Sequence, residues 1–249
     1  MAPFVSIITV VYNGKKHLEK TILSIIEQTG QNIEYIIIDG GSKDGTVDII
    51  KKHQNKISKW ISEPDKGIYD AMNKGLKLAS GEYVWYMNAG DVIYSNDTLQ
   101  QIAGIHQREH ADVYYGETEE TDENGKRIGM RRLKAPGTLT WENFSMGMVV
   151  CHQSILIKKE LCSEYNLSYR ISADIDWIIN AVKKSSTIVN THLILSKFQH
   201  GGLSRNNITR ALKERFGIMT KHYGLVPTFF NHFIIGMKFL IFVLRNGRY

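Results

Sequence analysis

Tyr83-Val84-Trp85-Tyr86-Met87-Asn88-Ala89-Gly90-Asp91 is an apolar run that ends in a short turn and a carboxylate. The first five of these residues are bulky and apolar, which predicts a buried β-strand. Gly90 allows the backbone to bend where the strand ends, and Asp91 follows the bend. Because ligands of open α/β sheets bind at the carboxyl ends of the strands, the run predicts an α/β protein with Asp91 at a ligand site.

The segments before this run alternate between short apolar stretches and stretches with apolar residues at helical spacing. We expect strands at residues 5–11, 35–39 and 59–62, and helices at residues 15–28, 44–52 and 68–79. A β-α-β-α alternation implies a mostly parallel, doubly wound sheet with right-handed crossovers and helices on both faces. The expected fold class is therefore α/β.

The second half of the chain is less regular but contains no linker that would separate two domains. An Asn-Gly turn at 124–125 predicts a hairpin. Further helices are expected at residues 95–109 and 174–184, and further strands at 112–116, 154–157 and 191–198. Residues 1–225 are thus expected to form one domain, in which the second half extends the sheet of the first.

Residues 226–249 differ from the rest of the chain, because they are rich in Phe, Ile and Leu and end with Arg245 and Arg248. The apolar stretch at 231–244 includes His232 and Lys238, and it is shorter than the roughly 20 residues of a membrane-spanning helix. The preferred interpretation is a membrane-associating helix that lies in the interface, with basic flanks. A packed terminal helix and a true membrane span remain as alternatives.

The composition is that of a globular protein, with 43% apolar residues, a net charge of +6 and a pI of about 9.1. The basic residues are scattered, apart from a concentration towards the C-terminus, so they favour an anionic surface or ligand but not nucleic acid. Cys151 and Cys162 have no metal-binding spacing, which fits a reducing compartment. The chain starts with no cleavable signal, and we expect a cytoplasmic location.

Polar residues end three of the expected parallel strands, namely residues 9–13, Asp39 and Asp91. A single aspartate after a strand is usually a turn or helix cap, but three such groups at one sheet edge, with Asp65 nearby, favour a binding site. The chain has neither a GxGxxG nor a GxxxxGK[ST] motif to hold phosphates. A diphosphate would therefore need Mg²⁺ or Mn²⁺, and Asp91 can supply a carboxylate ligand.

Four segments, in this order and spacing, resemble the family 2 glycosyltransferases: residues 5–13 (VSIITVVYN), 38–46 (IDGGSKDGT), 65–75 (DKGIYDAMNKG) and 87–91 (MNAGD). A looser resemblance continues through residues 151–153, 172–177 and 201–204, and the tail is not covered. The resemblance implies a GT-A nucleotide-diphospho-sugar transferase fold, with a donor half at about 1–116 and an acceptor half at about 117–225. It also implies inverting transfer of a hexosyl or N-acetylhexosaminyl group to an acceptor hydroxyl.

The resemblance also implies roles for single residues on the donor side. Thr9 and Tyr12 would line the nucleoside pocket, and Asp39 would accept a hydrogen bond from the base, with uracil and hence a UDP-sugar expected. Asp65 and Lys66 would lie beside the nucleoside or the sugar. Asp91 would hold the metal, although Asn88 and Ala89 precede it where the family's fuller motif is Asp-x-Asp.

On the acceptor side, the family places its catalytic base in a Glu-Asp pair at the start of a helix. Ala173-Asp174 occupies that position, so the resemblance implies Asp174 as the base that takes the acceptor proton, with Asp176 as the alternative. A helix cap is the structural alternative for Asp174. Further contacts with donor or acceptor are expected from Asn73, Asn88, His152, Gln153, Gly202, Ser204 and Arg205.

The preferred function is a glycosyltransferase on the inner face of the cell membrane, acting on a lipid-linked glycan in surface polysaccharide biosynthesis. One alternative is a nucleotidyltransferase, although residues 12–16 are a poor version of the glycine-rich basic loop that such an enzyme needs. A second alternative is a non-catalytic membrane scaffold that binds nucleotide sugars. The sequence does not indicate the donor sugar, the acceptor or the oligomeric state.

Overall fold

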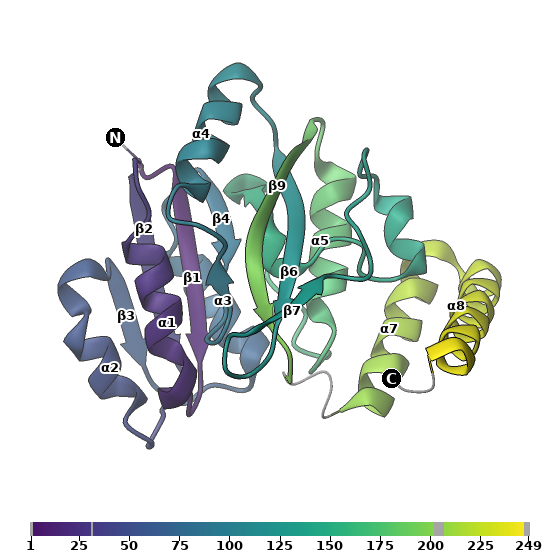
Figure 1. Cartoon of the computed structure of the whole chain (residues 1–249), viewed down its shortest axis with the longest axis horizontal. Coiled ribbons are helices and arrows are strands. Elements are labelled where there is room, and N and C mark those ends of the chain that lie inside the picture. The colour runs from purple at the N-terminus through teal and green to yellow at the C-terminus, as the bar shows by residue number, and fades with distance from the viewer. Residues whose placement is uncertain (1, 31, 202–206, 247–249) are drawn as a thin grey trace.

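A computed structural model describes residues 2–30, 32–201 and 207–246 of the chain (Figure 1). Within these ranges, nine strands form one sheet in the order β3-β2-β1-β4-β8-β6-β9-β5, and β7 pairs with β6. The strands are β1 (Val5–Val11), β2 (Ile33–Asp39), β3 (Lys59–Ser62), β4 (Tyr83–Tyr86), β5 (Val92–Ile93), β6 (Val113–Thr121), β7 (Arg127–Met130), β8 (Ile155–Lys158) and β9 (Ile188–Gln199).

Helices cover both faces of the sheet, as the β-α alternation predicts. The helices are α1 (Lys15–Ile26), α2 (Thr46–Lys52), α3 (Ile68–Leu78), α4 (Thr98–Arg108), α5 (Ala173–Lys184), α7 (Ile208–Tyr223) and α8 (Leu225–Asn246). Four short 3-10 helices accompany them: η1 (Gln54–Lys56), η2 (Trp141–Met146), η3 (His152–Ser154) and η4 (Lys159–Leu161). Side chains alternate along β1, so that Ile8 packs in a core with α3 and α5, whereas Ile7 packs in a core with α1 and α4.

The two halves of the sheet differ in strand direction. β3, β2, β1 and β4 are parallel to one another, which confirms the expected doubly wound arrangement for the first half. β8 then runs antiparallel to both β4 and β6, while β9 runs parallel to β6 and antiparallel to β5. The parallel half brings the ends of four strands to one edge, and the mixed half builds onto β4.

The end of the chain contains two consecutive helices where one was expected. α7 was not predicted, because its few buried apolar residues, Ala211, Ile218 and Met219, give only a weak helical pattern. α8 begins six residues before the expected apolar stretch, and Pro227 lies within its first turn, where proline is tolerated. Among the described residues, no helix combines the length and the apolar character needed to cross a membrane.

Glu34 ties three strands together near the start of β2, at the end of the parallel sheet opposite to Asp91. Its carboxylate accepts hydrogen bonds from Ser80 and Ser6, and it pairs with Lys59 at 2.7 Å. Burial disfavours the charge of Glu34, but these partners outweigh it and lower the pKa of Glu34 to about 2. This group supports the sheet and takes no part in the candidate site.

Candidate active site

The carboxyl ends of the first four strands meet at one edge of the sheet. Asp39, the last residue of β2, is paired in register with Val11 on one side and with Ser62 on the other. The backbone N–H of Ala89 reaches the carbonyl of Val10 at 3.3 Å, which places the turn after β4 beside the end of β1. The expected gathering of polar strand ends is therefore present.

Side chains join the loop after β1 to the loop after β2. The backbone N–H of Asn13 donates to Oγ of Ser42 at 2.7 Å, and the N–H of Lys43 donates back to Oδ1 of Asn13 at 3.0 Å. The N–H of Gly14 donates to Oγ1 of Thr46 at 3.0 Å. Asn13 adopts a positive φ of 48°, a conformation that asparagine tolerates well. These bonds explain why Ser42 and Thr46 follow Asp39 at this spacing.

Asp39 is fully buried, and its two carboxylate oxygens have different environments. Oδ2 accepts hydrogen bonds from the N–H groups of Gly41 and Ser42 and from the hydroxyl of Ser62, at 3.1, 3.0 and 2.6 Å. Oδ1 is buried and, within the described chain, has no hydrogen-bond partner. Because an unpartnered buried oxygen is unfavourable, Oδ1 is a ready acceptor for a ligand N–H.

Tyr12 and Asp65 lie next to each other above the end of β2. A Cβ at Gly40 would collide with Oδ2 of Asp65 and would lie 3.3 Å from Cδ2 of Tyr12, so any larger residue there would displace the Asp65 carboxylate. Asp65 accepts a hydrogen bond from the N–H of Gly67 at 2.8 Å through Oδ1. The ring of Tyr12 is 67% exposed, which leaves it open to contact a flat ligand.

Thr9 and Lys66, the two other residues expected on the donor side, differ in exposure: Thr9 is buried and Lys66 is exposed. Thr9 is fully buried, and its hydroxyl donates to the carbonyl of Met87 at 2.7 Å, so it supports the end of β4. The nucleoside contact expected of Thr9 stays a prediction. Lys66 is exposed, and its backbone carbonyl accepts a hydrogen bond from Arg170.

Asp91 is almost fully buried, and protein donors hold both of its oxygens. The side-chain amide of Gln153 donates to Oδ2 and the backbone N–H of Gln199 donates to Oδ1, each at 2.9 Å. Burial raises the pKa of Asp91 to about 7, and the two hydrogen bonds and the charge of Lys20 only partly oppose it. A cation beside Asp91 would favour the ionised form.

The turn that presents Asp91 is fixed by α1. The hydroxyl of Thr21 donates to the carbonyl of Asp91 at 2.7 Å and accepts the N–H of Gly90 at 2.9 Å. Gly90 has a φ of +109°, which favours glycine. Lys20, one residue earlier on α1, donates to Oε1 of Gln199. The sequence patterns did not indicate that Thr21, Lys20 and Gln199 contact the turn at Asp91, because these contacts join segments that are distant in the sequence.

Asn88 is the residue that best fits as a second ligand of a cation. Its side-chain oxygen is buried and has no partner among the described residues, and it belongs to the same turn as Asp91. Amide and carboxylate oxygens are ligands that Mg²⁺ and Mn²⁺ accept. Within the described residues there is no group of three or more His, Cys, Asp or Glu side chains that could hold a metal alone. The turn therefore fits a cation that takes its other ligands from phosphate and water.

Asp174 lies in the first turn of α5 and is half-buried. Its Oδ1 accepts hydrogen bonds from the N–H of Ile175 at 3.0 Å and from the hydroxyl of Tyr69 at 3.3 Å. Both of these bonds go to Oδ1, and among the described residues none is made to Oδ2. Burial raises the pKa of Asp174, and the positive charge of Arg215 on α7 opposes this increase. An oriented carboxylate with one available oxygen can accept a proton.

Helix α7 braces the start of α5. Glu214 accepts the N–H groups of Ile171 and Ser172 through Oε2, at 2.8 and 3.1 Å, directly before α5 begins. Arg215, the next residue, has a buried Nε without a hydrogen-bond partner in the described parts of the chain. α7 thus supplies the residues that support Asp174.

Asp176 is also bound to α7, in a way that argues against its use as a base. It is almost fully buried and pairs with Lys221 at 2.9 Å and with His222 at 2.6 Å. Burial favours the neutral acid, but these partners prevail and lower the pKa of Asp176. Asp176, the alternative base predicted from the sequence, therefore forms ion pairs that hold α5 against α7.

Two other expected contact residues are engaged inside the fold. Asn73 uses both ends of its amide on the backbone of Tyr165, donating to the carbonyl at 3.0 Å and accepting the N–H at 2.7 Å. His152 is buried, stacks on Tyr86 and lies 2.8 Å from the hydroxyl of Tyr165, and burial lowers its pKa to about 3. Both residues stabilise the core through these contacts, and the ligand contacts expected of them stay predictions.

The remaining predicted contacts divide into two groups. Gln153 does lie in the site, where it orients Asp91 through its side-chain amide. Gly202, Ser204 and Arg205 lie outside the described residues.

The fold is that of the GT-A glycosyltransferases. Residues 6–172 of the 249-residue chain match the family model Glycosyl transferase family 2. The chain therefore belongs to this family and is an enzyme that transfers glycosyl groups. The resemblance seen in the sequence motifs is confirmed.

Relatives of similar length carry related descriptions. The PGL/p-HBAD biosynthesis glycosyltransferase of Mycobacterium bovis (strain BCG / Pasteur 1173P2) is 29% identical over 229 residues, which cover 88% of this chain and 86% of that protein. A glycosyltransferase of Mycobacterium tuberculosis (strain ATCC 25618 / H37Rv), described as uncharacterized, is 29% identical over 89% of this chain and 86% of its own length.

Solved structures show the same fold at lower identity. S. aureus TarS 1–349 in complex with UDP-GlcNAc has a TM-score of 0.71 at 18% identity, covering 92% of this chain and 72% of that one. The mannosyltransferase PcManGT from Pyrobaculum calidifontis, in complex with GDP-Man and Mn²⁺, has a TM-score of 0.62 at 16% identity, covering 87% and 64%. The chain spans 39% of the longer TarS chain.

Proposed function

We propose that the protein is an inverting glycosyltransferase that moves a sugar from a UDP-sugar to an acceptor hydroxyl. The observation that carries the proposal is the environment of Asp39, which has one oxygen held by three donors and the other buried and unpartnered. Uracil presents an N3–H donor to such an oxygen, whereas cytosine presents an acceptor at that position. The exposed ring of Tyr12 beside Asp39 is suited to contact the base.

A divalent cation, Mg²⁺ or Mn²⁺, would be held by Asp91 together with the side-chain oxygen of Asn88. When bound, it would supply positive charge to the departing diphosphate. Gln153 and Gln199 keep the Asp91 carboxylate in a fixed orientation. PcManGT, a structural neighbour, was solved with Mn²⁺.

Asp174 is proposed as the base. Tyr69 and the N–H of Ile175 fix Oδ1 of the carboxylate, which leaves Oδ2 to take the proton from the acceptor hydroxyl. The resulting alkoxide-like oxygen attacks the anomeric carbon from the face opposite the diphosphate, so the new glycosidic bond has inverted configuration. Arg215 favours the ionised carboxylate that this step requires.

We propose a lipid-linked glycan on the inner face of the cell membrane as the acceptor. Two observations support it: the apolar C-terminal helix, and the relative named for PGL/p-HBAD biosynthesis. A nucleotidyltransferase is less well supported, because the loop after β1 is held by side chains of the next loop and offers no phosphate cradle.

The test is a transfer assay on Asp174→Asn with Asp176→Asn as the matched control. Asp174→Asn should bind UDP as the wild type does but lose transfer by about 10²–10⁴-fold, the usual contribution of a general base. Asp176→Asn should keep the activity of each folded molecule and lower its stability, since it removes the charge that pairs with Lys221 and His222. A non-catalytic scaffold would instead show no transfer in the wild type with any UDP- or GDP-sugar.

A further inference from the structure

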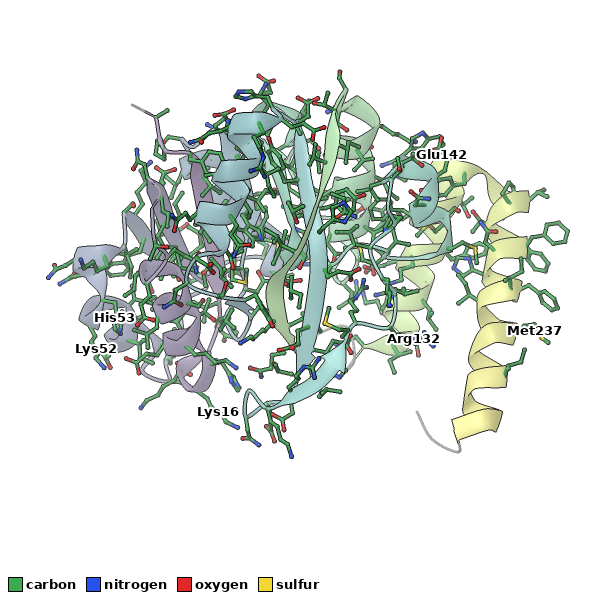
Figure 2. The ribbon with its side chains drawn as sticks, turned by 45° about the horizontal axis from the view of Figure 1, so that its top comes forward. Lys16, Lys52, His53, Arg132, Glu142 and Met237 are labelled. Atoms are coloured by element: carbon green, nitrogen blue, oxygen red, sulfur yellow. The ribbon has the colours of Figure 1, made fainter. Side chains whose placement is uncertain are left out.

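Helix α8 exposes a continuous apolar surface. Eight of its side chains are between 42% and 65% exposed: Leu225, Val226, Phe229, Phe230, Phe233, Ile234, Met237 and Ile241. At about 100° per residue, these eight fall within one half of the helix circumference. Met237 lies on the side of α8 that faces away from the sheet (Figure 2). We call this set of eight residues the α8 stripe.

The α8 stripe is exposed although α8 is docked on the protein, because other residues of the helix make the contact. Thr228 is buried, and the side-chain amide of Asn231 donates to the carbonyl of Ser145 in η2 at 3.3 Å. The ring of His232 packs against Phe216 of α7, with ring centroids 5.1 Å apart. The helix is therefore held in an orientation that turns its apolar half outwards. Soluble monomers rarely expose an apolar patch of this extent without a partner.

Charge distinguishes between the surfaces that could cover the α8 stripe. Residues 225–249 contain three Lys or Arg residues, Lys238, Arg245 and Arg248, and no Asp or Glu. Two copies meeting through α8 would bring two such cationic segments together, which is unfavourable. An anionic bilayer offers both an apolar layer for the Phe side chains and negative head groups for the basic residues. The described part of α8 does not qualify as a membrane span, so the helix would lie in the plane of the bilayer surface.

We propose that the α8 stripe inserts into the surface of an anionic lipid bilayer and holds the enzyme there. This inference rests on α8 alone, and it extends the proposed function by fixing where the acceptor is met. α7 connects the bound helix to the base, because it packs against α8 through Phe216 and supports the start of α5 through Glu214. The base thus works next to the membrane, where a lipid-linked acceptor is available.

The test uses the full chain and vesicles of phosphatidylcholine with or without phosphatidylglycerol. The wild type should co-float with vesicles that contain phosphatidylglycerol and bind less at high salt. Phe229→Ser/Phe233→Ser should lower the partition coefficient by about tenfold or more. The matched control is Leu23→Ser/Ile128→Ser, which changes two exposed apolar residues away from α8 and should bind as the wild type does.

UDP-sugar hydrolysis without vesicles, measured on the same preparations, separates this proposal from the proposed function. Equal hydrolysis by the wild type and the Phe variant, with vesicle binding lost only in the variant, supports the proposal. Wild-type protein that fails to bind either kind of vesicle overturns it, as does equal binding by the Phe variant. A dimer that dissociates in the Phe variant, without vesicle binding, assigns the stripe to a second copy. If the wild type binds vesicles but hydrolyses no UDP-sugar, the result contradicts the proposed use of a UDP-sugar and leaves the membrane proposal supported.

Discussion

Gln153 donates its side-chain amide to Oδ2 of Asp91 at 2.9 Å, although the two residues are 62 positions apart. The oxygen of the same amide accepts a hydrogen bond from the thiol of Cys151 at 3.0 Å, which fixes which end of the amide faces Asp91. The carboxylate proposed to hold the metal is therefore oriented by a residue from the second half of the chain.

Gln153→Ala should weaken metal-dependent activity. Loss of the donor leaves Asp91 buried with one partner fewer, and substitutions of residues that orient a metal ligand typically lower affinity by about 10–100-fold. The measurement is the Mn²⁺ concentration that gives half-maximal UDP-sugar hydrolysis. Gln28→Ala is the control, since Gln28 bonds the carbonyls of Ser24 and Ser95 in a structural role. An unchanged Mn²⁺ requirement in Gln153→Ala would show that Asp91 does not depend on this bond.

Asp39→Asn should weaken UDP binding by about tenfold or more. The asparagine side chain has only one oxygen, so its N–H₂ group must face either the N–H groups of Gly41 and Ser42 or the N3–H of the base. In both orientations one donor faces another, and a hydrogen bond is lost. Isothermal titration with UDP measures the effect. Ser62→Ala removes one donor from Oδ2 but leaves Oδ1 as it is, so its effect should be smaller. Equal losses in the two variants would argue against recognition by Oδ1.

Arg215→Met should shift the acid limb of the pH–activity profile to higher pH. Burial already raises the pKa of Asp174, and Arg215 opposes this increase. Without the guanidinium the pKa rises further, so at a given acidic pH a smaller fraction of Asp174 is ionised and able to act as a base. Activity should therefore fall more on the acid side of the profile than on its alkaline side. Arg215→Lys keeps the charge and should keep the profile, and a profile unmoved in Arg215→Met would remove Asp174 from this role.

Glu34→Gln should lower the free energy of unfolding by about 2 kcal/mol at neutral pH. The pKa of Glu34 is about 2 in the folded protein against an ordinary value of 4.5, so ionised Glu34 stabilises the fold above pH 4.5. This contribution is lost as the pH falls from 4.5 towards 2, and the curves of wild type and variant should converge there. Urea unfolding across this range measures the difference. Glu123→Gln, which changes an exposed pair with Lys16, should show little difference across this range.

The first half of the fold was predictable because each strand and the turn after it are recognisable from neighbouring residues in the sequence. β1, β2 and β4 are short apolar runs, and the turn residues after each one mark the strand end. Parallel strands joined by helices leave little choice of topology, so the meeting of Asp39 and the turn at Asp91 followed from the pattern.

The side-chain roles that depend on distant segments were not predictable. The position of Thr9 under Met87 depends on packing between neighbouring strands, and that of Asn73 depends on a loop 92 residues away. Asp176 sits two residues after Asp174 and has the same charge, yet only α7 determines that one is tied and the other is available. α7 carries too few buried apolar residues to be evident from periodicity.

Gly224, with a φ of +86°, separates the last turn of α7 from α8 and sets a practical limit for protein engineering. A chain cut before Ile208 would lose Glu214 and Lys221, and with them the contacts that support the start of α5. A stop codon directly after Gly224 would remove the eight-residue α8 stripe while keeping those contacts. A chain that ends at Gly224 is therefore the truncation to compare with the full chain in assays without lipid.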